Sequence, residues 1–260
     1  MAIGRTKDRG HWTKAVEEAS VYSVAKRSNA HVVFGEGVWY NNSMRLYHGS
    51  QNEVVMPRYG LGQDQHDFGR GFYLTDTEEL AKEWAVYKPK SADGWVHAFD
   101  LDLEGLRVLD YRNGNVFAWI AELMRHRDAD ESAAYRRRAP LFIEKYGVKD
   151  ADDYDVVIGW RANASYFYIV KAFVRGEIDP DCLPELLKLG GFGIQYVVRS
   201  SKAYERLQAL VDLRQRVSYA TYHEAYENRD SAARRKMYDL IEDQEFNQLR
   251  RSFNDLIREG

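Results

Sequence analysis

The chain has 260 residues, enough to bury a sizeable hydrophobic core. Apolar residues make up 45% and charged residues 30%, which is typical of a globular protein and excludes collagen-like or proline-rich disorder. Lysine and arginine number 37 against 40 aspartate and glutamate residues, so the formal net charge is −3. A protein that binds nucleic acid over its whole surface is basic, so only local basic patches of this chain can serve such a partner.

The cysteine count and the apolar runs indicate where in the cell the protein is expected to be. The single cysteine, Cys182, excludes an internal disulfide framework and a multi-cysteine zinc site, and no metal is expected. The first residues show no apolar core of a secretory signal, and no apolar run is long enough to cross a bilayer. We therefore expect a cytoplasmic protein of bacterial type with no membrane partner.

Apolar spacing and turn residues predict a mixture of helices and strands. The chain opens with a predicted helix over residues 11–28 and a strand and turn over 31–43. Further strands are predicted over residues 45–48, 71–75, 95–99, 106–109, 156–159 and 194–198. Helices are predicted over residues 76–87, 115–146, 166–175 and 184–188, and two long helices, Ala203 to Val217 and Met237 to Ile257, are predicted to close the chain. Because strands and helices do not alternate regularly, the predicted fold class is α+β.

Two segments stand out together. The first, Leu46-Tyr47-His48-Gly49-Ser50, ends a predicted strand. The second runs from Asp67 to Thr75 as Asp-Phe-Gly-Arg-Gly-Phe-Tyr-Leu-Thr, and Trp84 follows Tyr73 by 11 residues. The pair resembles the NAD-binding signature of ADP-ribosyltransferases of the diphtheria-toxin and poly(ADP-ribose) polymerase type.

The rest of the chain is similar to a bacterial branch of that superfamily whose domain long had no assigned function. The similar segments are residues 155–162, 165–167 and 193–198. The resemblance covers about residues 45–208 and implies an ADP-ribosyltransferase-like split β-sheet core, with a helical insertion near 115–146. Residues 1–44 would form a helical N-terminal extension and residues 209–260 a pair of C-terminal helices.

The resemblance implies NAD as a consumed co-substrate and assigns a role to each residue of the two segments. His48 would bind a hydroxyl of the adenosine ribose, and Ser50 would add its own hydroxyl nearby. Tyr73 and Trp84 would hold the nicotinamide ring between them, since aromatic contacts add about 0.5–1.5 kcal/mol beyond area burial. Gly49 has no Cβ, so its backbone can approach the ring and pair with the carboxamide. Tyr73 and Trp84 also have a purely structural interpretation, as core residues of a strand and a helix.

The third strand departs from the usual pattern. Many relatives carry a glutamate where this chain has Gln195, in Gln-Tyr-Val-Val. An amide can still hydrogen-bond a ribose hydroxyl, but it cannot act as a general base, a role typically worth ~10²–10⁴-fold in rate. We therefore expect transfer of a single ADP-ribose rather than polymer synthesis. A strand residue facing solvent is the structural alternative for Gln195.

Several other charged residues have both a functional and a structural interpretation. Arg70 would either contact the NAD pyrophosphate, as a charge-assisted pair, or form a surface salt bridge. Asp64, His66 and Asp67 lie in the same loop, which covers the donor site in relatives. Asp155 and Arg161 flank a buried strand and are expected to form structural pairs. Two basic runs are expected to be solvated helix faces, with a nucleic-acid or acidic-partner patch as the alternative: residues 136–138 and 234–236.

The predicted function is an NAD-dependent mono-ADP-ribosyltransferase with catalytic residues His48, Tyr73 and Gln195. The acceptor, a protein or a nucleic acid, is left open. Bacterial relatives of this kind are often toxins of toxin–antitoxin or anti-phage systems, which implies an antitoxin protein as a partner. The alternatives are a non-catalytic module that binds NAD or ADP-ribose, an NAD glycohydrolase, and an RNA 2′-phosphotransferase on a related fold.

Overall fold

The computed structural model describes residues 43–54, 56–87, 92–127, 129–130, 132–162, 164–187, 189–191 and 193–258. The helix expected over 11–28 lies outside the described residues. The strand and turn expected over 31–43 also lie outside them, except for Ser43, which opens the first strand.

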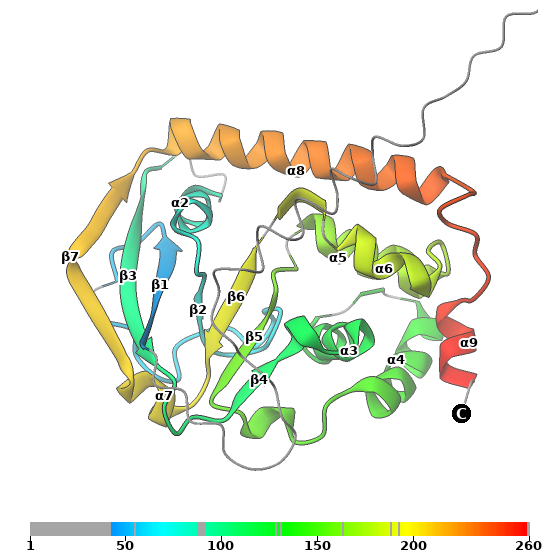
Figure 1. The fold of residues 1–260 in the computed structure, drawn as a ribbon, viewed down its shortest axis with the longest axis horizontal. Coiled ribbons are helices and arrows are strands. Elements are labelled where there is room, and N and C mark those ends of the chain that lie inside the picture. Colours follow the sequence, from blue (N-terminus) through cyan, green and yellow to red (C-terminus); the bar gives the residue numbers. More distant parts are fainter. Residues whose placement is uncertain are drawn as a thin grey trace, which may run out of the picture. The chain divides into compact units, whose positions relative to one another are not determined.

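Strands and helices are mixed along the described chain, as an α+β fold requires (Figure 1). The strands are β1 (Ser43–Ser50), β2 (Phe72–Leu74), β3 (Gly94–Asp102), β4 (Val108–Asp110), β5 (Val156–Trp160), β6 (Ile194–Val198) and β7 (Leu207–Val217). The helices are α2 (Glu78–Val86), α3 (Val116–His126), α4 (Ala133–Tyr146), α5 (Ala164–Arg175), α6 (Leu183–Leu186), α7 (Ser201–Glu205), α8 (Tyr219–Glu242) and α9 (Phe253–Arg258). Short 3₁₀ turns occur at η1 (Tyr111–Asn113), η2 (Ala151–Asp153), η3 (Pro180–Cys182) and η4 (Leu189–Gly191).

The strands form two separate sheets. The first has the order β1-β3-β7 and is antiparallel throughout. The second has the order β2-β6-β5-β4, with only the β4–β5 pair parallel. One backbone bridge, Tyr47 with Thr75, joins the edge strand β1 of the first sheet to the chain just after β2 in the second. The two sheets therefore meet at the two segments that the sequence singled out.

Two apolar layers hold the second sheet. One layer lies between the sheets and includes Leu46, Phe99 and Phe72, so that side chains from both sheets meet there. The larger layer covers the opposite face of the second sheet and includes Trp119, Phe142 and other side chains of α3, α4, α5, α8 and α9. No helix among the described residues is long and apolar enough to span a membrane.

The C-terminal region differs from its prediction. Residues 207–217, expected as part of a long helix, form strand β7 on the edge of the first sheet. Its pairing with β3 shifts register between Val96 and Ala98, and this irregularity breaks the strict alternation by which a strand is recognised. The second expected helix is two helices, α8 and α9, separated by residues 243–252. Residues 115–146 are helical as expected but form two helices, α3 and α4.

Helix α2 packs closely on the first sheet at Gly49. A Cβ built on Gly49 would lie 1.9 Å from the carbonyl oxygen of Ala81 and 2.7 Å from the amide nitrogen of Ala85. The backbone of α2 therefore occupies the space that a side chain at this position would need. Glycine at this position is a packing requirement of the fold, whatever else it does.

We predict that Gly49→Ala lowers the free energy of unfolding by about 1–3 kcal/mol, because α2 must shift to admit the methyl group. Urea denaturation measures the change. Gly114→Ala is the matched control, since its Cβ would lie 4.0 Å from the nearest atom, the carbonyl oxygen of Tyr111. Equal stability of the two variants would contradict the close contact between β1 and α2.

Candidate functional site

His48 and Tyr73 are neighbours. His48 Nδ1 lies 2.8 Å from the carbonyl oxygen of Tyr73, and the His48 ring packs against Phe72 at 4.4 Å between centroids. Since a carbonyl oxygen only accepts, Nδ1 carries the proton and Nε2 is left as an acceptor. The two segments that the sequence predicted to form one site are thus joined by a side-chain hydrogen bond.

The His48 imidazole is neutral at physiological pH. Burial lowers its pKa to about 4, although the carbonyl of Tyr73 opposes that shift. His97, paired opposite His48 in the β1–β3 ladder, adds to the lowering. No described residue donates to His48 Nε2, so this nitrogen is free to accept a hydrogen bond from a ligand hydroxyl.

Gly49 presents its peptide groups away from the first sheet. Tyr47 exchanges both of its backbone hydrogen bonds with Thr75, so its N–H and C=O point away from β3. Backbone direction alternates along an antiparallel strand, and Gly49, two residues further on, therefore points the same way. This gives one donor and one acceptor on the edge of β1 where the β2 segment lies, whereas α2 packs on the face to which a Cβ of Gly49 would point.

Tyr73 and Gln195 lie on one face of the second sheet. Tyr73 is paired with Val197, and Gln195 comes two residues before Val197 on β6, so the three side chains share a face. The Tyr73 hydroxyl donates to the Gly69 carbonyl at 2.7 Å and accepts from the Phe68 amide at 3.0 Å. Burial raises the pKa of this phenol, so it remains protonated. The Tyr73 hydroxyl thus holds the preceding loop in place.

Gln195 does not face solvent. It is 4% exposed, and its Nε2 donates to Asp67 Oδ2 at 2.7 Å. The same Asp67 carboxylate accepts from Arg127 Nη1 at 2.5 Å and from the Ala162 amide at 2.9 Å. The Asp67 carboxylate therefore accepts hydrogen bonds from a guanidinium, a backbone amide and the Gln195 side chain. No described residue donates to Gln195 Oε1, which leaves that oxygen available to a ligand.

Trp84 is buried, and Arg161 covers one part of its surface. The guanidinium carbon of Arg161 lies 4.7 Å from the centre of the indole ring. Trp84 forms no ring contact with Tyr73 in the described structure. The aromatic pair proposed from the 11-residue spacing is therefore not closed, and Arg161 lies where one face of the indole would be offered to a ligand.

Ser50 and Arg70 form hydrogen bonds within their own segments. Ser50 Oγ accepts a hydrogen bond from the Asn52 amide at 3.2 Å and so shapes the turn after β1. Arg70 forms a two-point salt bridge with Asp64, at 2.9 Å and 2.8 Å, on the surface. Of the two roles expected for Arg70, the structure contains the salt bridge.

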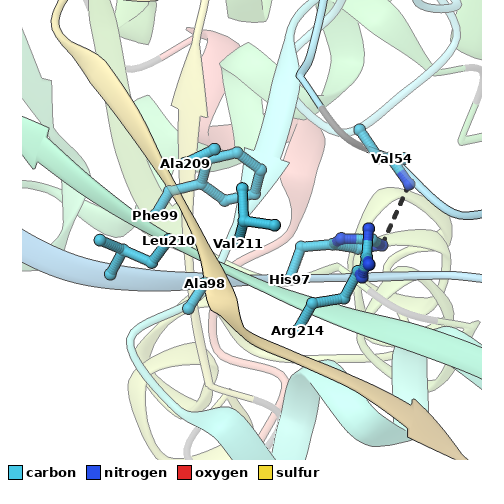
Figure 2. Close-up of a pocket in the computed structure, with 8 residues that line it drawn as sticks. All are labelled: Val54, His97, Ala98, Phe99, Ala209, Leu210, Val211 and Arg214. Carbon is cyan, nitrogen blue, oxygen red and sulfur yellow. Dashed lines mark hydrogen bonds between the residues drawn. The ribbon is translucent and has the colours of Figure 1, made fainter.

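Arg70 also lines a polar cavity of about 420 Å³ at the other end of the second sheet from Gln195. Its walls come from the loop before β2 and from the chain around Asp152 and Arg199. A much smaller pocket, about 10 Å³, lies against β3 and β7 beside His97, whose Nε2 accepts from the Val54 amide at 3.1 Å (Figure 2). That volume admits no more than about one water molecule.

Of the two flanking residues expected to form structural pairs, one does. Asp155 accepts from the Arg107 amide at 2.8 Å and from Ser200 Oγ at 2.5 Å, which ties β5 to its neighbours. Arg161 has no carboxylate partner among the described residues. Sequence reasoning also missed Arg127, because nothing local to its helix end marks a partner 60 residues away in the loop. No group of three or more His, Cys, Asp or Glu side chains suited to a metal ion is found in the described part of the chain.

The fold and site thus define an α+β protein with two sheets that meet at His48 and Tyr73. The chain belongs to the family described as a protein of unknown function, DUF3990, whose model matches residues 44–209. No curated protein and no solved structure matches the chain.

We predict that His48 makes the protein less stable in acid. The pKa of His48 is about 4 in the folded chain and about 6.5 in an unfolded one, so the unfolded state binds more protons between these values. Stability therefore falls as the pH is lowered from about 6.5 to about 4. Urea denaturation at about pH 7 and about pH 5 should show a smaller loss in His48→Gln than in the wild type. Burial also lowers the pKa of His97, so some loss remains in the variant, but an equal loss in both proteins would contradict the assignment.

Proposed function

We propose that the protein is an NAD-dependent mono-ADP-ribosyltransferase with an ADP-ribosyltransferase-like split-sheet core. The observation that carries the proposal is the hydrogen bond from His48 to the Tyr73 carbonyl, since it joins the two motif segments at the junction of the two sheets. Gly49, Gln195 and Trp84 then lie on elements that converge near that junction. A chance resemblance of short segments gives no reason for them to meet.

In this proposal each group has a task set by its chemistry. His48 Nε2 accepts from a hydroxyl of the adenosine ribose. The N–H and C=O of Gly49 pair with the nicotinamide carboxamide, which offers the complementary acceptor and donor. Tyr73 and Trp84 contact the nicotinamide ring, and Gln195 Oε1 accepts from a hydroxyl of the ribose attached to it.

The reaction cleaves the bond between the nicotinamide nitrogen and the ribose C1. The bonding electron pair leaves with nicotinamide, which becomes neutral, and C1 develops oxocarbenium character. A nucleophile of the acceptor then forms a bond to C1 and loses its proton to water. Gln195 cannot remove that proton, and the negative charge of Asp67 is balanced by Arg127, so an acceptor that is already nucleophilic is favoured.

A second candidate is a module that binds NAD or ADP-ribose without turnover. Its support is the contact of Gln195 with Asp67, which fixes the amide of Gln195 and leaves the site with no uncompensated carboxylate. A glycohydrolase, in which water is the acceptor, is the remaining alternative. A cytoplasmic toxin with an antitoxin partner is the biological context that we propose from the resemblance alone.

We predict that the protein releases nicotinamide from NAD and that Tyr73→Ala abolishes this release while the fold survives. Chromatography of nicotinamide after incubation with NAD measures turnover, and calorimetry measures NAD binding. Tyr238→Phe is the control, because Tyr238 is 43% exposed on α8 and lies outside the proposed site.

The outcomes separate the candidates. Binding of NAD without release of nicotinamide under any acceptor condition would support the binding module. Release with no ADP-ribose found by mass spectrometry on candidate protein or RNA acceptors would support the glycohydrolase. Full activity of Tyr73→Ala would return this residue to a purely structural role and overturn the proposed site.

A second prediction concerns the missing glutamate. Gln195→Glu alone places two carboxylates at hydrogen-bond distance, so we expect it to destabilise the protein and not to raise activity. Asp67→Asn with Gln195→Glu exchanges the amide and the carboxylate and keeps a hydrogen bond between the two side chains, at the cost of the bond that the Ala162 amide donates to the same Asp67 oxygen. We expect the double variant to be more stable than Gln195→Glu and to release nicotinamide faster than the wild type, toward the ~10²-fold end of general-base effects. A double variant no more stable than Gln195→Glu would contradict the pairing of Asp67 with Gln195.

A further inference from the structure

Arg161 is a partly buried cation whose side chain stacks on Trp84 but has no salt-bridge or hydrogen-bond partner among the described residues. It follows β5, and its backbone amide donates to the Gly193 carbonyl at 3.2 Å, which fixes the chain next to the start of β6. No described residue forms a salt bridge or hydrogen bond with its side chain, and its Nη1 is fully buried without a hydrogen-bond acceptor. Leaving such a donor unsatisfied costs about 1–3 kcal/mol, and more for a charged group.

Trp84 carries a second unsatisfied donor beside it. The indole Nε1 is also fully buried without an acceptor, and the Arg161 guanidinium lies against the same ring at 4.7 Å. Two hydrogen-bond donors, one of them charged, are therefore grouped where the end of β5 meets α2. Such a pair suits a group with several acceptor oxygens and a negative charge.

The neighbouring carboxylates are already engaged. Asp67 is bound by Arg127 at 2.5 Å, and Glu83 of α2 is bound by Arg229 of α8. Three arginines thus face two carboxylates among the described residues of this region, and the surplus positive charge falls on Arg161. Burial lowers the pKa of the Arg161 guanidinium, although Asp67 and other nearby groups oppose that shift, so the surrounding protein compensates the charge only in part.

We propose that Arg161, together with the indole N–H of Trp84, binds a phosphate-type anionic group of the ligand. That the group is the diphosphate of NAD rests on the proposed function. The pyridinium ring of NAD and the Arg161 guanidinium are both cations and cannot share the Trp84 face. When the ring binds, the guanidinium must leave the indole, and an anionic group of the same ligand is the partner that accepts it. Arg161, rather than Arg70 with its own Asp64, then holds the diphosphate.

The test measures thermal unfolding of the full chain with inorganic pyrophosphate and calorimetric binding of NAD. Pyrophosphate should raise the melting temperature of the wild type in a concentration-dependent way. Arg161→Gln should lose that rise and bind NAD about tenfold to a hundredfold more weakly, the factor expected for one charge-assisted hydrogen bond. Arg161→Lys should keep part of the rise. Arg216→Gln, at an arginine that is 69% exposed on β7 and paired with Asp93, should behave as wild type.

The free protein supplies an independent readout. Because Arg161 forms no salt bridge with a described residue, Arg161→Gln without ligand should melt no lower than the wild type. Replacing an arginine with a structural role would instead lower the melting temperature. A pyrophosphate response that is absent in the wild type, or unchanged in Arg161→Gln, would overturn the anion site. NAD bound and cleaved equally well by both proteins would overturn it while the proposed function stands. A pyrophosphate response lost in Arg161→Gln, with NAD neither bound nor cleaved, would uphold the anion site and reject the proposed function.

Discussion

The carboxylate of Asp67 is the interaction on which the arrangement of the candidate site depends. It binds Arg127 at the end of α3, the amide of Ala162 after β5, and Gln195 on β6. A carboxylate that is 8% exposed is stable only when its oxygens are satisfied, and here three donors from three distant segments satisfy them. Removing any one of these donors would loosen the loop that leads into β2, and with it the position of Tyr73.

The second constraint is the junction of the two sheets. Tyr47 and Thr75 exchange two backbone hydrogen bonds, and His48 adds a side-chain bond to Tyr73. These contacts place the end of β1 next to β2. The close approach of α2 to Gly49 fixes the position of that helix beside the junction. The groups that the proposal uses therefore lie on strands and one helix, whose backbones are held by regular pairing. Such elements position functional groups more accurately than loops do.

Salt bridges distinguish Arg161 from the neighbouring arginines of this region. Arg127 and Arg229 each bind a buried carboxylate and stabilise the contacts between elements. Arg161 binds none, although it stands among them. A buried polar group left unsatisfied in a native structure calls for an explanation, and a ligand that satisfies it is one. Helix α8 contacts α2, η4 and α5, and its residue Arg229 binds Glu83 of α2 (Figure 1).

The sequence by itself determined the α+β class and six of the seven described strands, and its resemblance to ADP-ribosyltransferases predicted that the His48 and Tyr73 segments form one unit. The class and the strands follow from local patterns, namely short β-rich runs and turn glycines, which are readable within a few residues. The sequence did not predict strand β7, because its apolar residues at 207, 210 and 211 have the spacing of a helix. The strand tolerates this irregular pattern because its register shifts against β3. Only the tertiary structure decided that Gln195 turns to Asp67, that Arg161 lies on Trp84, and that Arg70 pairs with Asp64. Each of these outcomes depends on which charges and donors meet across the fold, and no pattern along the chain encodes such a meeting.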